Sequence, residues 1–335
     1  MLAASATGCG PPECKFRGTI NDPANLSMRR AMLRKGMGDF CSQMMKHDAP
    51  LRLAPDSPII GRFYPTQCVA PEGDELHVAF NGFGYAWTNV TKKLTFTTGA
   101  SALYRYDFIV TESDPCQVYA YFRTSRVDSS EFRVQRIEGG AASVFNAFTS
   151  MGESFGRQLV AQKLNEGFTV IHDSEAKTDE FGLGVIQVGK RPFHPYQVRG
   201  ADKVTYENER VEVHQNQRDF VGPIVVEESG RAIFVSATVD GAPAVDVMFM
   251  GKMEGEASLR QYFDVAQAGP LPAGPFAGDV LRAGTELKRA VPVPPGMYYV
   301  VFDNTAFAGQ VSPPGNAYDD RAAVINYLIQ IGDAS

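Results

Sequence analysis

The chain has 335 residues, of which 44% are hydrophobic and 21% are charged, which is typical of a folded protein with room for two cores. Lysine and arginine total 32 against 38 acidic residues, and the net charge of −6 argues against general binding to nucleic acid. No run of about 18 apolar residues occurs, so the sequence predicts no membrane-spanning helix.

Small and apolar residues lead up to Cys9, which ends the sequence ATGC. This stretch resembles the lipobox of bacterial lipoproteins, in which the cysteine is acylated and everything before it is removed. Ala6 stands where that family prefers leucine, and the charged and fully apolar parts of a signal peptide are absent. A start codon assigned too late, inside the signal, would explain these departures. The resemblance then implies that residues 1–8 are the remnant of a truncated signal. An unprocessed N-terminus with an incidental cysteine is the alternative.

The lipobox-like start implies a lipid-anchored protein of the cell envelope. Gly10, rather than an aspartate, follows Cys9, which resembles the sorting signal for the outer membrane in enterobacterial lipoproteins. The location implied is therefore periplasmic or on the cell surface, anchored to the outer membrane.

The chain has five cysteines, and four remain for disulfides if Cys9 carries lipid. The other four can close two disulfides in an oxidising compartment, and the sequence leaves all three pairings open; they are Cys14, Cys41, Cys68 and Cys116. No pair has the short spacing of a structural zinc knuckle. Buried free thiols remain the other alternative.

Residues 9–66 are expected to form a tether, a helix and an extended wrap. Apolar residues on one helical face predict a helix from about residue 23 to residue 46; they are Leu33, Met37, Phe40 and Met44. Because Cys41 lies on the same side, we expect this face to pack in the core. The alternative is a helix that lies on a membrane surface, because basic residues neighbour this face, namely Arg29, Arg30, Arg34 and Lys35. The proline-rich residues 49–68 predict extended chain rather than a regular element.

Residues 67–198 are expected to form an α+β domain. Alternating apolar residues from Leu76 onward predict a hairpin with its turn at Asn81-Gly82, followed by strands over residues 93–110 and 116–137. The pattern indicates an antiparallel sheet with one face in water. A helix is predicted over residues 141–165, stopped by Gly167 and packed on this sheet, and residues 168–189 should form two strands around an acidic loop.

Residues 199–335 are predicted to be strands throughout, in a β-sandwich or jelly roll. The sequence indicates a hairpin at Asp240-Gly241, a proline-limited edge strand before a turn at Pro295-Gly296, and a terminal strand over residues 322–332. The stretch VPPGMYYVVFDN with its flanking hairpin loosely resembles the pre-peptidase C-terminal and GOLD-like modules of secreted bacterial proteins. The resemblance implies a module that binds or stabilises. The whole chain is thus predicted to be mainly β with two amphipathic helices (α+β) and antiparallel sheets.

Four groups of residues offer chemistry. Gly152-Glu153-Ser154-Phe155-Gly156 matches the nucleophile elbow of serine hydrolases, but that elbow needs a strand-to-helix turn and here the surrounding period is helical. A metal could be held by His172, Asp173 and Glu175, and calcium by Asp303 with Asn304 or by Asp319 with Asp320. Solvated loops and turn caps are the alternatives. An envelope hydrolase centred on Ser154 or on the His172 cluster is therefore the rival hypothesis.

We expect a non-enzymatic secreted protein with a binding or assembly role, with no catalytic residues, no metal and no cofactor. Its expected partners are the membrane, through the lipid, and another envelope protein or a surface polymer, but no nucleic acid. Tyr119 and Tyr121 are the possible binding surface, because they should be exposed on the strand face opposite Val118, Ala120 and Phe122. An ordinary half-exposed strand is the alternative.

Overall fold

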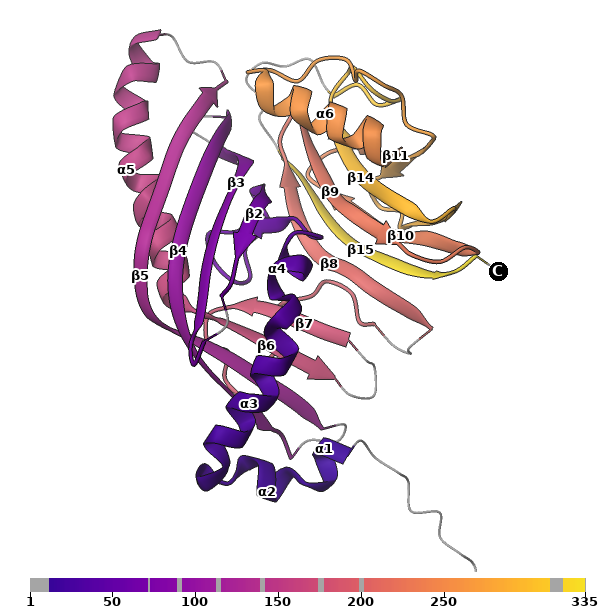
Figure 1. Ribbon diagram of the computed structural model, residues 1–335. Helices are drawn as coiled ribbons and strands as arrows, with labels where there is room; N and C mark the ends of the chain where they lie inside the picture. The colour runs from indigo at the N-terminus through magenta and orange to yellow at the C-terminus, as the bar shows by residue number, and fades with distance from the viewer. Residues whose placement is uncertain are drawn as a thin grey trace, which may run out of the picture.

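The computed structural model describes residues 12–71, 73–88, 92–112, 116–138, 142–173, 178–198, 202–313 and 322–334. It consists of an N-terminal helical segment, a curled seven-stranded sheet and a C-terminal β-sandwich (Figure 1). The predicted class, mainly β with helices and antiparallel sheets, is confirmed. Within the described ranges, no helix combines the length and the hydropathy needed to cross a membrane.

The predicted N-terminal helix is broken into short pieces. Within the predicted range of residues 23–46 the helices are α3 (Leu26–Gly36) and α4 (Phe40–Met44), with 3-10 turns at Pro23–Asn25 and Met37–Asp39. Two further short helices, α1 (Pro12–Lys15) and α2 (Arg17–Asn21), precede this range. Gly36 and Gly38 lie at the break between α3 and α4, where their low helix propensity weakens a continuous helix. The predicted apolar face does pack inward, with Leu33, Met37 and Phe40 against the sheet.

The seven strands of the sheet follow one another in chain order, and every neighbouring pair is antiparallel. They are β1 (Ala49–Leu51), β2 (Gly61–Val69), β3 (Leu76–Thr88), β4 (Lys92–Val110), β5 (Gln117–Ile137), β6 (Phe168–Asp173) and β7 (Thr178–Leu183). We expected residues 49–68 to be extended chain without a regular element. This expectation is wrong, because these residues form β1 and most of β2. The boundary drawn after residue 66 therefore falls inside β2.

The hairpin predicted at Asn81-Gly82 is wrong, because β3 runs straight through these residues. Gly82 pairs with Pro65 on one side and with Thr98 on the other. A Cβ atom at Gly82 would lie 2.2 Å from the carbonyl oxygen of Tyr64 and 2.5 Å from the ring of Phe63. The glycine is needed for this close approach within a strand, which has the same sequence signature as a turn.

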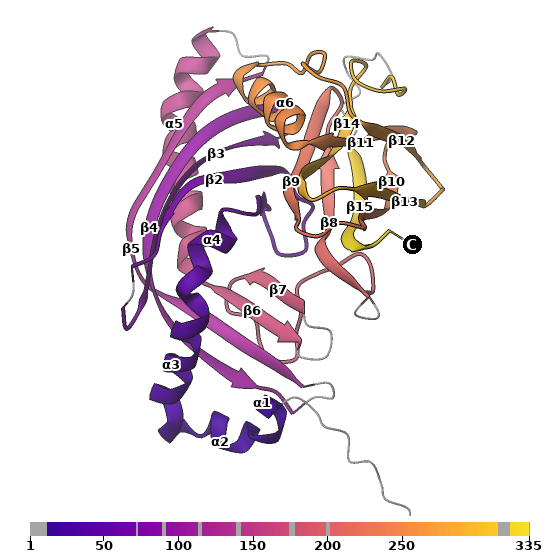
Figure 2. The ribbon, with the colours of Figure 1, turned by 45° about the vertical axis from the view of Figure 1, so that its right-hand side comes forward.

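The predicted central helix is confirmed as α5 (Ala142–Glu166), and Gly167 follows it with φ +69°. Helix α5 packs on β5, and a Cβ atom at Gly156 would lie 2.2 Å from the ring of Phe132. The helix and the sandwich lie on opposite sides of the curled sheet (Figure 2).

The predicted β-sandwich is confirmed. Its two four-stranded antiparallel sheets have the orders β13-β10-β15-β8 and β12-β11-β14-β9. The strands are β8 (Lys203–Val213), β9 (Gln217–Val226), β10 (Arg231–Asp240), β11 (Ala244–Gly251), β12 (Ala277–Arg282), β13 (Leu287–Val293), β14 (Gly296–Asn304) and β15 (Ala323–Asp333). As predicted, the proline-containing strand β13 lies at an edge.

Two expectations for the sandwich are wrong. The chain turns at Asp240-Gly241, with Gly241 at φ +81°. The turn does not form a hairpin, because the strands that it connects, β10 and β11, belong to different sheets. A helix that was not predicted, α6 (Lys252–Asp264), interrupts the strands. It buries four residues at helical spacing, namely Gly255, Ser258, Leu259 and Tyr262.

Two disulfides attach the helical segment to the sheet. Cys14 of α1 is bonded to Cys116 just before β5, with 6.0 Å between the Cα atoms, and Cys41 of α4 is bonded to Cys68 of β2, with 5.3 Å. Cys9 lies outside the described residues. The two bridges indicate an oxidising, extracytoplasmic location.

Candidate ligand-binding site

The two tyrosines predicted as a binding surface have different environments. Tyr119 is only 1% exposed, because the chain after β7 covers it: its Oη donates to the carbonyl of Lys190 at 3.1 Å and accepts from the N–H of Gly189 at 3.2 Å. The expectation that Tyr119 is exposed is therefore wrong, since strand alternation does not show what packs on the second face. Tyr121 is partly buried and lines a hollow.

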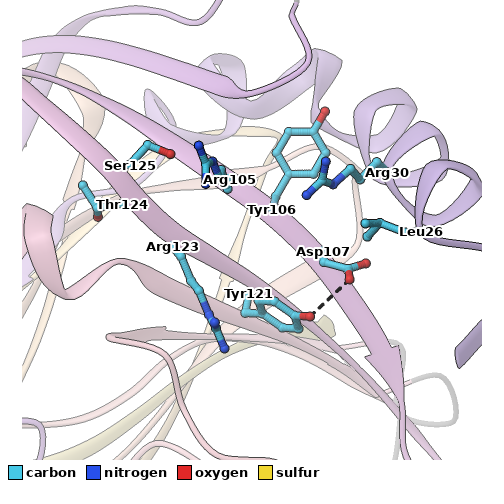
Figure 3. A pocket seen from close by; sticks show the side chains of 9 residues that line it. All are labelled: Leu26, Arg30, Arg105, Tyr106, Asp107, Tyr121, Arg123, Thr124 and Ser125. Atoms are coloured by element: carbon cyan, nitrogen blue, oxygen red, sulfur yellow. Dashed lines mark hydrogen bonds between the residues drawn. The ribbon is translucent and has the colours of Figure 1, made fainter. Parts of the chain in front are cut away.

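This hollow has a volume of about 520 Å³ and lies between α3, β4 and β5 (Figure 3). Its lining is polar and rich in arginine and tyrosine: Leu26, Arg30, Arg105, Tyr106, Asp107, Tyr121, Arg123, Thr124 and Ser125. The volume is within the range of about 300–1,000 Å³ typical of small-molecule sites.

The hollow forms where the edge of β4 loses its neighbouring strand. Strand β3 begins at Leu76, opposite Tyr104, so from Arg105 onward it no longer covers β4. The end of α2 takes its place: the side-chain amide of Asn21 donates to the carbonyl of Val110 at 2.7 Å and accepts from its N–H at 2.9 Å. Helix α3 then continues beside the sheet and forms one wall of the hollow.

An ion pair fixes α3 against the sheet. Arg29 donates from Nε to Oδ1 of Asp107 at 2.7 Å and from Nη2 to Oδ2 at 3.1 Å. Tyr121 donates to Oδ2 of the same carboxylate at 3.2 Å, and the N–H of Phe108 donates to Oδ1 at 2.8 Å. Burial alone would raise the pKa of Asp107, but the hydrogen bonds from Arg29 and Phe108 outweigh it and lower the pKa. Asp107 is thus ionised and fully engaged.

Two arginines come from neighbouring strands at the floor of the hollow, and their side chains extend in different directions (Figure 3). Arg105 of β4 is directly opposite Arg123 of β5 in the strand register. Arg105 donates from Nε to Glu75 at 2.8 Å, and Ser125 donates to the same carboxylate oxygen at 3.0 Å. Arg123 lies over the ring of Tyr121, 5.3 Å from its centroid, and has no ion-pair partner in the described part of the chain.

Arg30 contributes a third guanidinium, from α3. Its Nε is buried and has no hydrogen-bond partner among the described residues. Within the same ranges, Arg30 also has no carboxylate partner, because Asp107 is taken by its neighbour Arg29. Of the three arginines that line the hollow, Arg30 and the exposed Arg123 are therefore the two without a carboxylate partner among the described residues, in a chain of net charge −6.

Of the residues that line the hollow, the sequence analysis proposed Tyr121 for binding and none of the arginines. Arg105 and Arg123 lie inside strands that were correctly predicted, and an antiparallel register for those strands would have placed them opposite each other. No signal in the sequence places Arg30 there, because that depends on how α3 packs.

The predicted catalytic and metal residues do not come together. Ser154 is exposed in the interior of α5, not at a strand-to-helix turn. The Nδ1 of His172 lies 2.7 Å from a carboxylate oxygen of Asp179 on the neighbouring strand, while Asp173 pairs with Arg191 at 3.0 Å. Glu175 lies outside the described residues. In the described ranges, no group of three or more histidine, cysteine or acidic residues is placed to hold a metal.

The loop-end acids suggested for calcium are likewise engaged or undescribed. Asp303 is buried and bonded to Arg218 and Thr305, and the side chain of Asn304 donates to the carbonyl of Val213 at 3.2 Å. Asp319 and Asp320 lie outside the described residues.

A buried ionic cluster joins the sheet to the sandwich. Arg62 of β2 is unexposed and donates to Asp219 at 2.8 Å, to Glu207 at 2.9 Å, to Asp48, and to the hydroxyl of Tyr327 at 2.6 Å. Three carboxylates surround a single cation, and burial raises the pKa of Glu207 to about 8. These side chains are at most 11% exposed, so we assign the cluster to the internal architecture rather than to ligand binding.

Comparisons with known proteins add no functional information. No family model matches the sequence, and a search of curated proteins gives no match. Among solved structures, one similar chain is the Bombyx mori GH32 beta-fructofuranosidase BmSUC1, with 9% identity and a TM-score of 0.14 over 82% of this chain and 80% of that chain. A TM-score this low carries no argument about fold or function.

Proposed function

We propose that this protein is an extracytoplasmic lipoprotein of the bacterial envelope that binds a ligand in the hollow and performs no chemistry of its own. The use of the cysteines carries the proposal. Four of the five form two disulfides, which leaves Cys9, in the lipobox-like ATGC, as the one without a cysteine partner in the chain. A single unpaired cysteine at that position suits acylation.

The first disulfide would link the anchor firmly to the fold. Cys14 follows Cys9 by five positions, a reach of at most about 18 Å for extended chain. Its bond to Cys116 would hold the start of β5 close to the membrane surface. The hollow on β4 and β5 would then be carried by the same sheet that the anchor secures.

The environment of the candidate chemical residues supports a binding role. Ser154 has the geometry of a helix residue, His172 pairs with Asp179 of the neighbouring strand, and Asp173 pairs with Arg191 in the chain after β7. The hollow instead presents unpaired guanidinium groups and aromatic rings, which serve recognition. An envelope partner or surface polymer would supply the ligand, and the sandwich would stabilise the assembly.

Metabolic labelling with an alkyne fatty acid tests the anchor. The chain is expressed from its own gene in its own host, purified from membranes and analysed by intact mass before and after reduction. We expect fatty-acid label on the wild type, none on Cys9→Ser, and in both a mass gain of two hydrogens for each disulfide reduced. An unlabelled wild-type chain that retains an unmodified Cys9 would overturn the lipoprotein assignment.

A further inference from the structure

We propose that the hollow between α3, β4 and β5 binds an oxyanion, a carboxylate or phosphate group carried on a small ring-shaped ligand such as an acidic sugar. This rests on the binding role proposed above and names the chemical class of its ligand.

The unpaired guanidinium groups are the first argument. Arg30 and Arg123 line the hollow from different elements, and neither has a carboxylate partner in the described ranges. A buried donor without an acceptor is costly, and the Nε of Arg30 is such a donor. The planar fork of a guanidinium matches the two oxygens of a carboxylate or phosphate.

The register of the two strands is the second, independent argument. Like charges directly opposite each other on neighbouring strands are destabilising, and Arg105 is directly opposite Arg123. Glu75 compensates only Arg105. An anion bound beside Arg123 would offset the part of this repulsion that water around the exposed side chains does not screen.

The acidic side chain in the lining of the hollow is already hydrogen-bonded within the protein. Both oxygens of Asp107 bond to Arg29, and Tyr121 and the N–H of Phe108 complete the shell of that carboxylate. Of the residues lining the hollow, Asp107 is the only acid. An anion that binds to Arg30 or Arg123 in this hollow would therefore be supplied by a ligand.

The ring portion of the ligand is assigned to Tyr121. Its hydroxyl is held by Asp107, which fixes the orientation of the aromatic ring, and Arg123 lies over one face of that ring, which leaves the other face for the ligand. An aromatic face offers apolar contact area at little cost in conformational entropy, and the volume of about 520 Å³ suits a ligand of monosaccharide size.

The test is calorimetric titration of the disulfide-bonded protein at low salt with four probes: glucose, glucuronate, glucose 6-phosphate and inorganic phosphate. The three ring probes differ mainly in their anionic group, so they separate the oxyanion from the ring. We expect both charged sugars to bind more tightly than glucose and more tightly than inorganic phosphate. The tighter of the two charged sugars identifies carboxylate or phosphate as the source of the oxyanion.

Three variants localise the binding. Arg30→Gln and Arg123→Gln should each weaken binding of the charged sugars at least about tenfold, since each loses a charge-assisted hydrogen bond. Arg133→Gln is the matched control, because Arg133 is exposed on the same strand β5 outside the hollow, and it should bind like the wild type. Thermal unfolding and the mass of the oxidised chain check that every variant is folded.

The outcomes separate this inference from the proposed function. Equal binding of glucose and the charged sugars would overturn the oxyanion assignment and leave a binding role intact. Inorganic phosphate binding as tightly as glucose 6-phosphate would overturn the ring contact. Failure of all four probes to bind, or wild-type affinity in both hollow variants, would overturn the inference entirely, while the labelling of Cys9 decides the lipoprotein assignment by itself.

Discussion

The side chain of Asn21 bonds to both backbone groups of Val110 and so replaces a missing strand at the edge of β4. A residue of a short helix thereby satisfies a backbone N–H and C=O that β3 leaves unpaired. The helical segment is consequently part of the sheet's hydrogen bonding, in addition to covering its core.

Replacing Asn21 with alanine should lower the free energy of unfolding by about 2 kcal/mol, because two partly buried hydrogen bonds are lost. Urea unfolding of the oxidised protein measures this change. Asn25→Ala is the matched control, since Asn25 makes one exposed hydrogen bond, to the carbonyl of Thr19, and its loss should cost far less. Equal effects of the two substitutions would show that Asn21 does not complete the sheet edge.

The two disulfides should differ in their contribution to stability. Cys14–Cys116 closes a separation of 102 residues and Cys41–Cys68 one of 27. In the chain-entropy model, removing the first should cost about 4.7 kcal/mol and removing the second about 3.5 kcal/mol. Paired serine substitutions at each bridge, compared by urea unfolding, check the order. A larger loss from the shorter bridge would contradict it.

Arg123→Gln should stabilise the unliganded protein while it weakens ligand binding. The substitution removes a charge directly opposite Arg105, a relief of about 0.5 kcal/mol. Because the repulsion is electrostatic, the gain should shrink as salt is added. Thermal unfolding at low and high salt, with Arg133→Gln for comparison, measures it. A loss of stability in Arg123→Gln would mean that Arg123 supports the fold rather than the site.

Stability should depend on the ionisation of Glu207. Burial raises the pKa of this carboxyl from 4.5 to about 8, so between these values the folded chain holds a proton that the unfolded chain has lost. The free energy of unfolding should therefore fall as the pH rises from about 5 to about 8, by at most about 1.4 kcal/mol per pH unit from this group. Glu207→Gln resembles the protonated form and should flatten this part of the profile. Urea unfolding at several pH values compares the two proteins, and an unchanged slope would contradict the assignment.

Ser154 should be chemically inert. A serine in the interior of α5 lacks the strained turn that exposes and activates a nucleophile. A fluorophosphonate probe should therefore label the wild type no more than Ser154→Ala. Specific labelling that disappears in the variant would restore the hydrolase hypothesis.

Alternating apolar residues were sufficient to predict most strands, because burial on one face imposes a period of two. They were insufficient at Gly82 and Gly241. A glycine inside a strand and a glycine in a turn look alike in sequence, and a turn does not say which sheet the next strand joins. Helix α6 was missed although its buried residues, from Gly255 to Tyr262, have helical spacing.

The site was less predictable than the fold for a related reason. The pattern of a single strand was enough to propose Tyr121. To predict that Arg105 lies opposite Arg123, the register between two strands must be known. The position of Arg30 needs the packing of a helix that the sequence predicts only as part of a longer one. Tyr119 shows the converse, because a distant segment covers a residue whose strand was predicted correctly.

The bonds of Arg62 also determine how the chain comes apart. Its partners Glu207, Asp219 and Tyr327 all belong to the sandwich, whereas Arg62 belongs to the sheet. A fragment limited to residues 202–334 would keep Glu207 and Asp219 and lose the cation that lies between them. Removing one partner of a buried ion pair strongly destabilises the fold, because the remaining charge is left without compensation. The curled sheet and the sandwich should accordingly melt in a single cooperative transition, and neither half is expected to be obtained as an independent folded piece.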